Sequence, residues 1–96
     1  MSSLIESLRP LLGVAPAGTV LFEQSQDEVL VIGAGRGVWL TVKYAPVDGR
    51  PDRYSVFEWG RGHIADLLAS HVCASGWELR TLIDQLFRKA PPHVAG

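Results

Sequence analysis

Cysteine and charge are both scarce in this 96-residue sequence, and each scarcity excludes a class of protein. Cys73 is the single cysteine, so no intramolecular disulfide can form, and a free thiol suits a reducing cytoplasm. Charged residues make up 20% of the chain where about 25% is typical. With a net charge of −1, the chain has no overall basic field that would draw it to phosphate backbones or anionic lipid.

Long apolar runs are also missing. No stretch approaches the roughly 20 consecutive apolar residues that a membrane-spanning helix needs. The first residues have neither the basic start nor the apolar run of a signal peptide. We therefore expect a cytoplasmic protein without a membrane partner.

Apolar residues, in contrast, are abundant. The hydrophobic fraction is 47%, and with glycine counted and tyrosine left out it rises to about 55%, against a usual 45–50%. A chain of this length forms one small domain, which buries only about two thirds of its unfolded surface. Some of the apolar surplus must therefore reach the surface. We expect a single domain over residues 1–90 and a disordered tail over 91–96.

Apolar residues at helical spacing predict three helices. The first lies near the amino terminus, where Ser3 and Glu6 form a capping box and Pro10 kinks or ends the helix. The second follows from the spacing of Ile64, Leu67, Leu68, His71 and Val72. The third covers 77–89, with a capping box at Ser75 and Glu78.

Four strands are predicted between the first two helices. Residues 19–24 and 28–33 are rich in β-branched and aromatic residues and flank a polar turn, which indicates a hairpin. Residues 38–44 alternate with period two, 46–52 are dense in turn formers, and 53–60 return as a fourth strand. The predicted fold is α+β: an antiparallel four-stranded meander with one N-terminal and two C-terminal helices, in the order α-β-β-β-β-α-α.

Residues 29–37, VLVIGAGRG, resemble the first strand and glycine loop of Rossmann dinucleotide-binding proteins. The third glycine of that motif falls at Val38, however, and an alternating β-branched run follows where the family has a helix. The chain is also too short for the remaining βαβ units. A glycine-rich hairpin turn explains the same residues, so we expect no nucleotide cofactor.

Metal and catalytic sites have little support. His63, His71 and Cys73 are the one close group of metal-ligand residue types, but on a helix His71 and Cys73 would point about 200° apart. Ser70 and His71 are adjacent, and on a helix they would face different sides. We therefore predict neither metal site nor catalytic residue nor cofactor, and no enzyme activity.

The 38–60 hairpin is the strongest functional candidate. A turn at Asp48-Gly49 sets a register in which Trp39 faces Trp59, Thr41 faces Phe57 and Lys43 faces Ser55. Both faces are then apolar, and the two C-terminal helices can cover one of them. The other is covered by the N-terminal helix or by a partner. The predicted partner-binding residues are Trp39, Thr41, Lys43, Arg50, Arg53, Phe57, Trp59 and Arg61.

These residues favour a non-catalytic protein-binding module that acts as a small chaperone, adaptor or inhibitor and can form a homodimer. The predicted architecture is similar in size and outline to compact inhibitors carried by phage and mobile elements, which would imply a bacterial or phage protein. The alternative is a nucleic-acid-binding module. It would use the arginine- and tryptophan-bearing sheet face or the C-terminal helix pair, although residues 36–63 carry a net charge of only +2.

Overall fold

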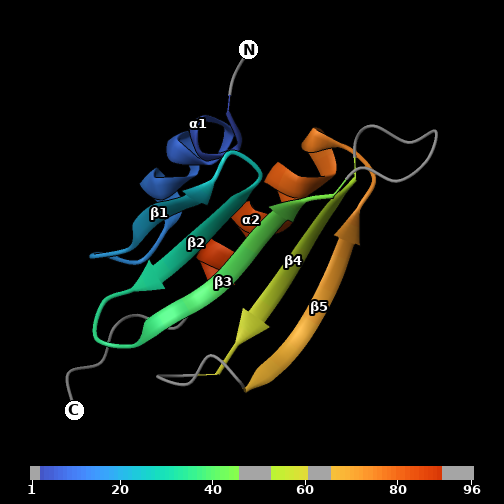
Figure 1. Ribbon diagram of the computed structural model, residues 1–96. Helices are drawn as coiled ribbons and strands as arrows, with labels where there is room; N and C mark the ends of the chain where they lie inside the picture. Colours follow the sequence, from blue (N-terminus) through green and yellow to red (C-terminus); the bar gives the residue numbers. More distant parts are fainter. Residues whose placement is uncertain (1–2, 46–52, 61–65, 90–96) are drawn as a thin grey trace.

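The computed structural model describes residues 3–45, 53–60 and 66–89, which form one layer of helices against one antiparallel sheet (Figure 1). The chain begins with α1 (Leu4–Leu8) and a 3-10 helix, η1 (Arg9–Val14). Five strands and α2 follow: β1 (Val20–Ser25), β2 (Glu28–Gly33), β3 (Gly37–Tyr44), β4 (Tyr54–Trp59), β5 (Leu67–Cys73) and α2 (Gly76–Lys89). The predicted tail, 91–96, and hairpin tip, 46–52, lie outside the described residues.

The strands follow one another across the sheet in the order β1-β2-β3-β4-β5, and every neighbouring pair is antiparallel. The predicted hairpin between 19–24 and 28–33 is confirmed. The register predicted for the 38–60 hairpin is confirmed over five pairs, from Leu40 opposite Glu58 to Tyr44 opposite Tyr54. Alternation of side chains and turn residues was therefore enough to align β3 with β4.

The predicted four-stranded sheet with two C-terminal helices is wrong. The segment predicted as the first of these helices is strand β5, which pairs with β4 along its length. Leu67, Leu68 and Val72, which supplied the helical stripe, are each at least half exposed. The helix was predicted on the assumption that these side chains face the core. Pairing with β4 instead satisfies the backbone of a segment whose Ser70 and Val72 are weak helix formers.

The two remaining helices agree with the sequence in most details. Pro10 marks the change from α1 to the tighter η1, because proline cannot donate the next helical hydrogen bond. Ser3 is the N-cap residue of α1, as predicted, but the predicted capping box is wrong, since the Ser3 side chain makes no capping bond. At α2 the capping box forms: the Glu78 amide donates to Ser75 Oγ (3.1 Å), and the Glu78 carboxylate accepts from the Ala74 amide (2.6 Å).

The glycine-rich segment is the turn between β2 and β3, which confirms a hairpin in place of a dinucleotide loop. Gly35 and Gly37 have positive φ angles of 71° and 82°, a region that favours glycine because it has no Cβ. Residues 37–44 continue as a strand. The Rossmann-like letters thus encode backbone conformation at a reversal of the chain.

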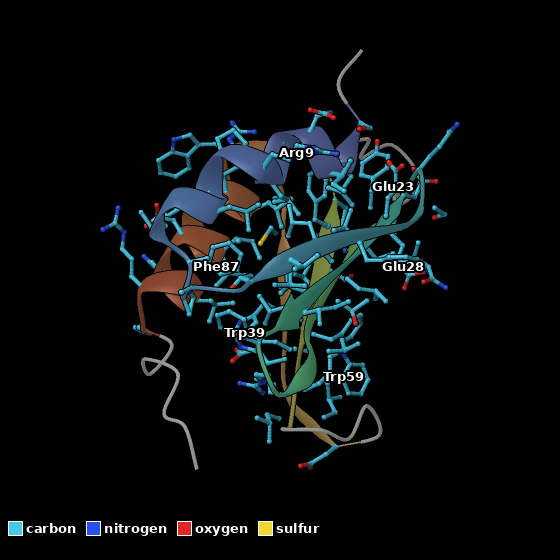
Figure 2. The ribbon with its side chains drawn as sticks, turned by 90° about the vertical axis from the view of Figure 1, so that its left-hand side faces the viewer. Arg9, Glu23, Glu28, Trp39, Trp59 and Phe87 are labelled. Atoms are coloured by element: carbon cyan, nitrogen blue, oxygen red, sulfur yellow. The ribbon has the colours of Figure 1, made fainter. Side chains whose placement is uncertain are left out.

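Both helical segments pack on one face of the sheet, and the core lies between them and the strands (Figure 2). Directly paired residues share a face, so the register sorts the side chains into rows across the sheet. The centre of this covered face consists of Val29, Val31, Leu40, Val42 and Val56, all fully buried. The helices contribute Leu4, Ile5, Leu8, Leu79, Ile83 and Phe87.

Candidate functional site

The opposite face of the sheet, called the open face below, is covered by no helix in the part of the chain that the structure describes. The strand register places three rows of neighbouring side chains on it. They are Val20–Ile32–Val38, Phe22–Leu30–Thr41–Phe57–Ser70 and Glu28–Lys43–Ser55–Val72, with Trp59 and Leu67 paired beyond them. The question of which face the N-terminal helix covers is thus answered: it packs on the same side as α2.

Trp39 does not lie on the open face, where the sequence placed it. A β-bulge interrupts the β2–β3 register: Val31 pairs with Leu40 and Ile32 pairs with Val38, which leaves Trp39 as the extra residue. Its ring packs against Phe87 of α2 with 5.5 Å between centroids and belongs to the buried core. The bulge carries the side chain to the helix side, which simple alternation could not predict.

Trp59 is held in place on the open face, and Figure 2 shows it on the side away from Phe87. Its indole Nε1 donates a hydrogen bond to Thr41 Oγ1 (2.7 Å), and its ring lies 6.3 Å from that of Phe57. The Arg36 guanidinium donates to the Trp59 carbonyl (3.0 Å) and stands over the Trp39 ring, 5.7 Å from its centroid. A side chain fixed in this way loses little conformational entropy on binding a partner.

Some of the other predicted partner-binding residues lie on the open face and others do not. Thr41, Lys43 and Phe57 share the open face with Trp59. Thr41 is buried beneath the indole, whereas Lys43 is exposed. Arg53 is half-buried just before β4, and Arg50 and Arg61 lie outside the described residues. The structure thus brings together four of the eight predicted residues.

Sequence reasoning missed the flanks of this surface because it considered one hairpin alone. Val20 and Phe22 on β1 are about half exposed, and Val72 on β5 is 65% exposed. Leu30, Ile32 and Val38 continue the apolar surface between the two edges. The signal was present in the alternation of β1, whereas the β5 residues were assigned to a helix.

Charge on the open face is low and balanced. Glu28 and Lys43 lie opposite each other at one end of the rows, and the remaining row members are uncharged. Phosphate contacts to nucleic acid need several cations on one surface. Among the paired residues of the three rows, Lys43 is the one cation, and it lies opposite a carboxylate.

Titratable groups gather away from the open face. His71 Nε2 and Glu58 Oε2 lie 2.5 Å apart on the helix side of β4 and β5. Cys73 is buried on the same side, and burial, with a smaller contribution from the Glu78 carboxylate, raises the pKa of its thiol. A raised pKa makes the thiol a poorer nucleophile at neutral pH. Within the described ranges no three His, Cys, Asp or Glu side chains come together as metal ligands, and His63 is outside them.

A hollow of about 610 Å³ opens at the end of the helix side, between α1, the β1–β2 turn and the start of α2. Tyr44 and Tyr54 pack against each other in its wall, with 5.1 Å between ring centroids and an angle of 45° between the ring planes. Asp27 and Arg80 line it with opposite charges, so neither an anion nor a cation is favoured by net charge.

No protein-family model, no curated protein and no solved structure matches this chain. Among the helices of the described residues, none has the length and hydropathy required to cross a membrane.

Proposed function

We propose that this chain is a non-catalytic protein-binding module whose contact surface is the open face. The observation that carries the proposal is a largely apolar surface of low, balanced charge across all five strands, on which Phe57 and Trp59 are held in place. Folded monomers expose few large apolar patches, and those they expose are often interaction sites. Aromatic residues held in one orientation are frequent among the residues that dominate binding energy.

The size of the open face fits this role. Five strands spaced about 4.8 Å apart, with six to eight residues at about 3.3 Å each, span roughly 24 by 20 Å. Side-chain relief enlarges this projected area toward the roughly 800 Å² that each partner buries in an ordinary protein–protein interface. One partner protein of moderate size is therefore sufficient to cover it.

A protein partner fits the charge of the surface better than nucleic acid does. Lys43 lies opposite Glu28 in the β2–β3 register, and the Arg36 guanidinium donates to the Trp59 carbonyl. Aromatic rings on a sheet can stack bases, but such surfaces also carry cations that track the phosphates. Chaperone, adaptor and inhibitor roles are all compatible with an apolar surface of this kind. The buried, unpaired Cys73 supports a reducing compartment, and we place the site of action in the cytoplasm.

The test compares two exposed aromatic residues on opposite sides of the molecule. Phe22 is 52% exposed on the open face, and Trp77 is 69% exposed on α2. Tagged wild type, Phe22→Lys and Trp77→Lys are used to capture proteins from the native host, and the captured protein is then purified and titrated. We expect Phe22→Lys to weaken its binding at least tenfold, because the lysine charge must be desolvated in an apolar interface.

Trp77→Lys is the matched control, since it introduces the same charge at an exposed aromatic site, and it should bind like the wild type. Equal binding by both variants, or loss in Trp77→Lys alone, contradicts the proposal. A mobility shift of labelled DNA or RNA at about 0.15 M salt that Phe22→Lys abolishes would instead establish the nucleic-acid alternative.

A further inference from the structure

Strand β5 forms one edge of the sheet and lacks the charged and proline residues that commonly protect an edge strand; its one irregularity is the register shift with β4 next to Leu68. Within the described residues it pairs with β4 alone, so its other side presents unpaired backbone donors and acceptors (Figure 1). The sequence of β5, LLASHVC, contains no Lys, Arg, Asp, Glu or Pro. Edge strands of monomeric proteins are commonly guarded by such residues, because an unguarded edge pairs with another chain.

The opposite edge strand, β1, is better protected than β5. β1 carries the charged Glu23, and α1 packs close to it. The exposed large hydrophobic residues are also more frequent on β5, where Leu67, Leu68 and Val72 are 50%, 63% and 65% exposed. β5 is therefore the edge at which pairing removes more apolar surface from water.

We propose that β5 pairs antiparallel with β5 of a second copy of this chain, which joins the two sheets into one sheet of ten strands. An antiparallel pair of identical strands has a two-fold axis, so the strand must be complementary to itself. With the axis at Ser70, Leu68 lies opposite Val72 of the second copy, and Ala69 lies opposite its His71. Each pair joins apolar to apolar or small to large, and no acidic or basic residue meets its own kind.

The faces also agree in this arrangement. The register with β4 places Ser70 and Val72 on the open face and Ala69 and His71 on the helix side, and the 63% exposed Leu68 is the extra residue at the register shift. The pairing keeps each set on its own side, so the two open faces become one continuous surface. The regular pairing of β5 with β4 runs from Ala69 to Cys73, so the proposed axis at Ser70 lies within the regular part of the strand.

A second copy fits better than an unrelated extended peptide, because the Leu68–Val72 contact is then made twice around the axis. A seven-residue strand of about 23 Å makes a small interface, so we expect dimers with a dissociation constant on the order of micromolar. The inference concerns the sheet edge and does not rest on the proposed function of the open face.

The first experiment measures mass by sedimentation equilibrium between about 1 and 200 μM chain, a range chosen to bracket a micromolar constant. Wild type should change from monomer to dimer. Val72→Lys should weaken the dimer at least tenfold, because each lysine lies in the apolar contact. Phe22→Lys, at a position that is also more than half exposed and lies on the same face at the β1 edge, should leave the constant unchanged. A monomer over the whole range, which is also what pairing with a foreign peptide predicts, or equal effects of the two variants, overturns the proposal.

The second experiment locates the contact by oxidation of single cysteines introduced into a Cys73→Ala background. Ser70→Cys places two thiols opposite each other at the axis and should give a covalent dimer. Ser55→Cys, one strand further in on the open face, should stay monomeric, because its copies would lie about 19 Å apart, three strand spacings across the sheet and four residues along it. Cross-linking of Ser55→Cys in preference to Ser70→Cys would show packing through the open faces and overturn the edge pairing.

The two proposals fail separately. If Val72→Lys is a monomer that still captures the partner protein, the open face functions without the dimer. If Ser70→Cys cross-links while Phe22→Lys captures the partner as well as wild type, the edge pairing stands and the proposed function is wrong.

Discussion

The two faces of the sheet are built from the same strands, yet they have different chemical surroundings. On the covered face, aliphatic side chains such as Val31 and Leu40 meet the helices and are fully buried. On the open face, Phe22 and Val72 are similarly apolar and are more than half exposed. Burial, not residue type, thus separates the two faces. The covered face supplies stability, and the open face is available for binding.

The largest expected difference between the faces is in stability. Phe87→Ala should lower the free energy of unfolding by about 3–5 kcal/mol, because it removes a buried ring that packs on Trp39 and leaves a cavity. Phe22→Ala, on the open face, should cost no more than about 1 kcal/mol. Urea denaturation of both variants measures the difference. Equal losses would mean that the open face is buried by part of the chain itself.

A smaller effect tests whether the open face is held rigid. The Trp59–Thr41 hydrogen bond should contribute about 0.5–1.5 kcal/mol, measured as the coupling energy of a double-mutant cycle with Trp59→Phe and Thr41→Val. Thr41→Val nearly keeps the side-chain size, and Trp59→Phe keeps an aromatic ring while it removes the Nε1–H donor; the coupling energy subtracts what each substitution costs alone. Additive effects of the two substitutions would show that the indole is not fixed by Thr41.

The smallest effect is expected at alkaline pH and belongs to the covered face. Burial raises the pKa of the Cys73 thiol above its ordinary value of 9.0, so the folded state holds this proton more tightly than the unfolded chain. The stabilisation is fully present below about pH 9 and is lost as the pH rises through the folded-state pKa. Thermal melts of wild type should therefore decline more steeply above pH 9 than those of Cys73→Ala, and parallel profiles would contradict this.

Local patterns predicted most of the fold. Alternation identified β3, turn residues set its register with β4, and the Ser75 and Glu78 pair located the start of α2. These features depend on residues close in sequence, or on a hairpin whose turn aligns its two strands. An apolar surface on the outer side of the 38–60 hairpin followed from the same alternation.

The errors arose where contacts distant in sequence prevailed over a local pattern. The apolar residues of 67–73 have helical spacing, but the segment pairs with the edge of β4 and is a strand. The bulge at Trp39 has no signal in its own segment, because it depends on how β2 and β3 align. Both features depend on which backbones pair across the sheet, and this cannot be predicted from the periodicity of one segment.

Composition and periodicity alone established an apolar, weakly charged α+β domain with more hydrophobic surface than one helical layer could bury. Only the tertiary structure determined which face stays open. Both α1 and α2 pack on the side where Val29, Val42 and Val56 form an aliphatic surface. Helices bury the most apolar area where they also pack against each other, and a small domain forms one such layer. The opposite side of the sheet is covered by no helix of the described residues.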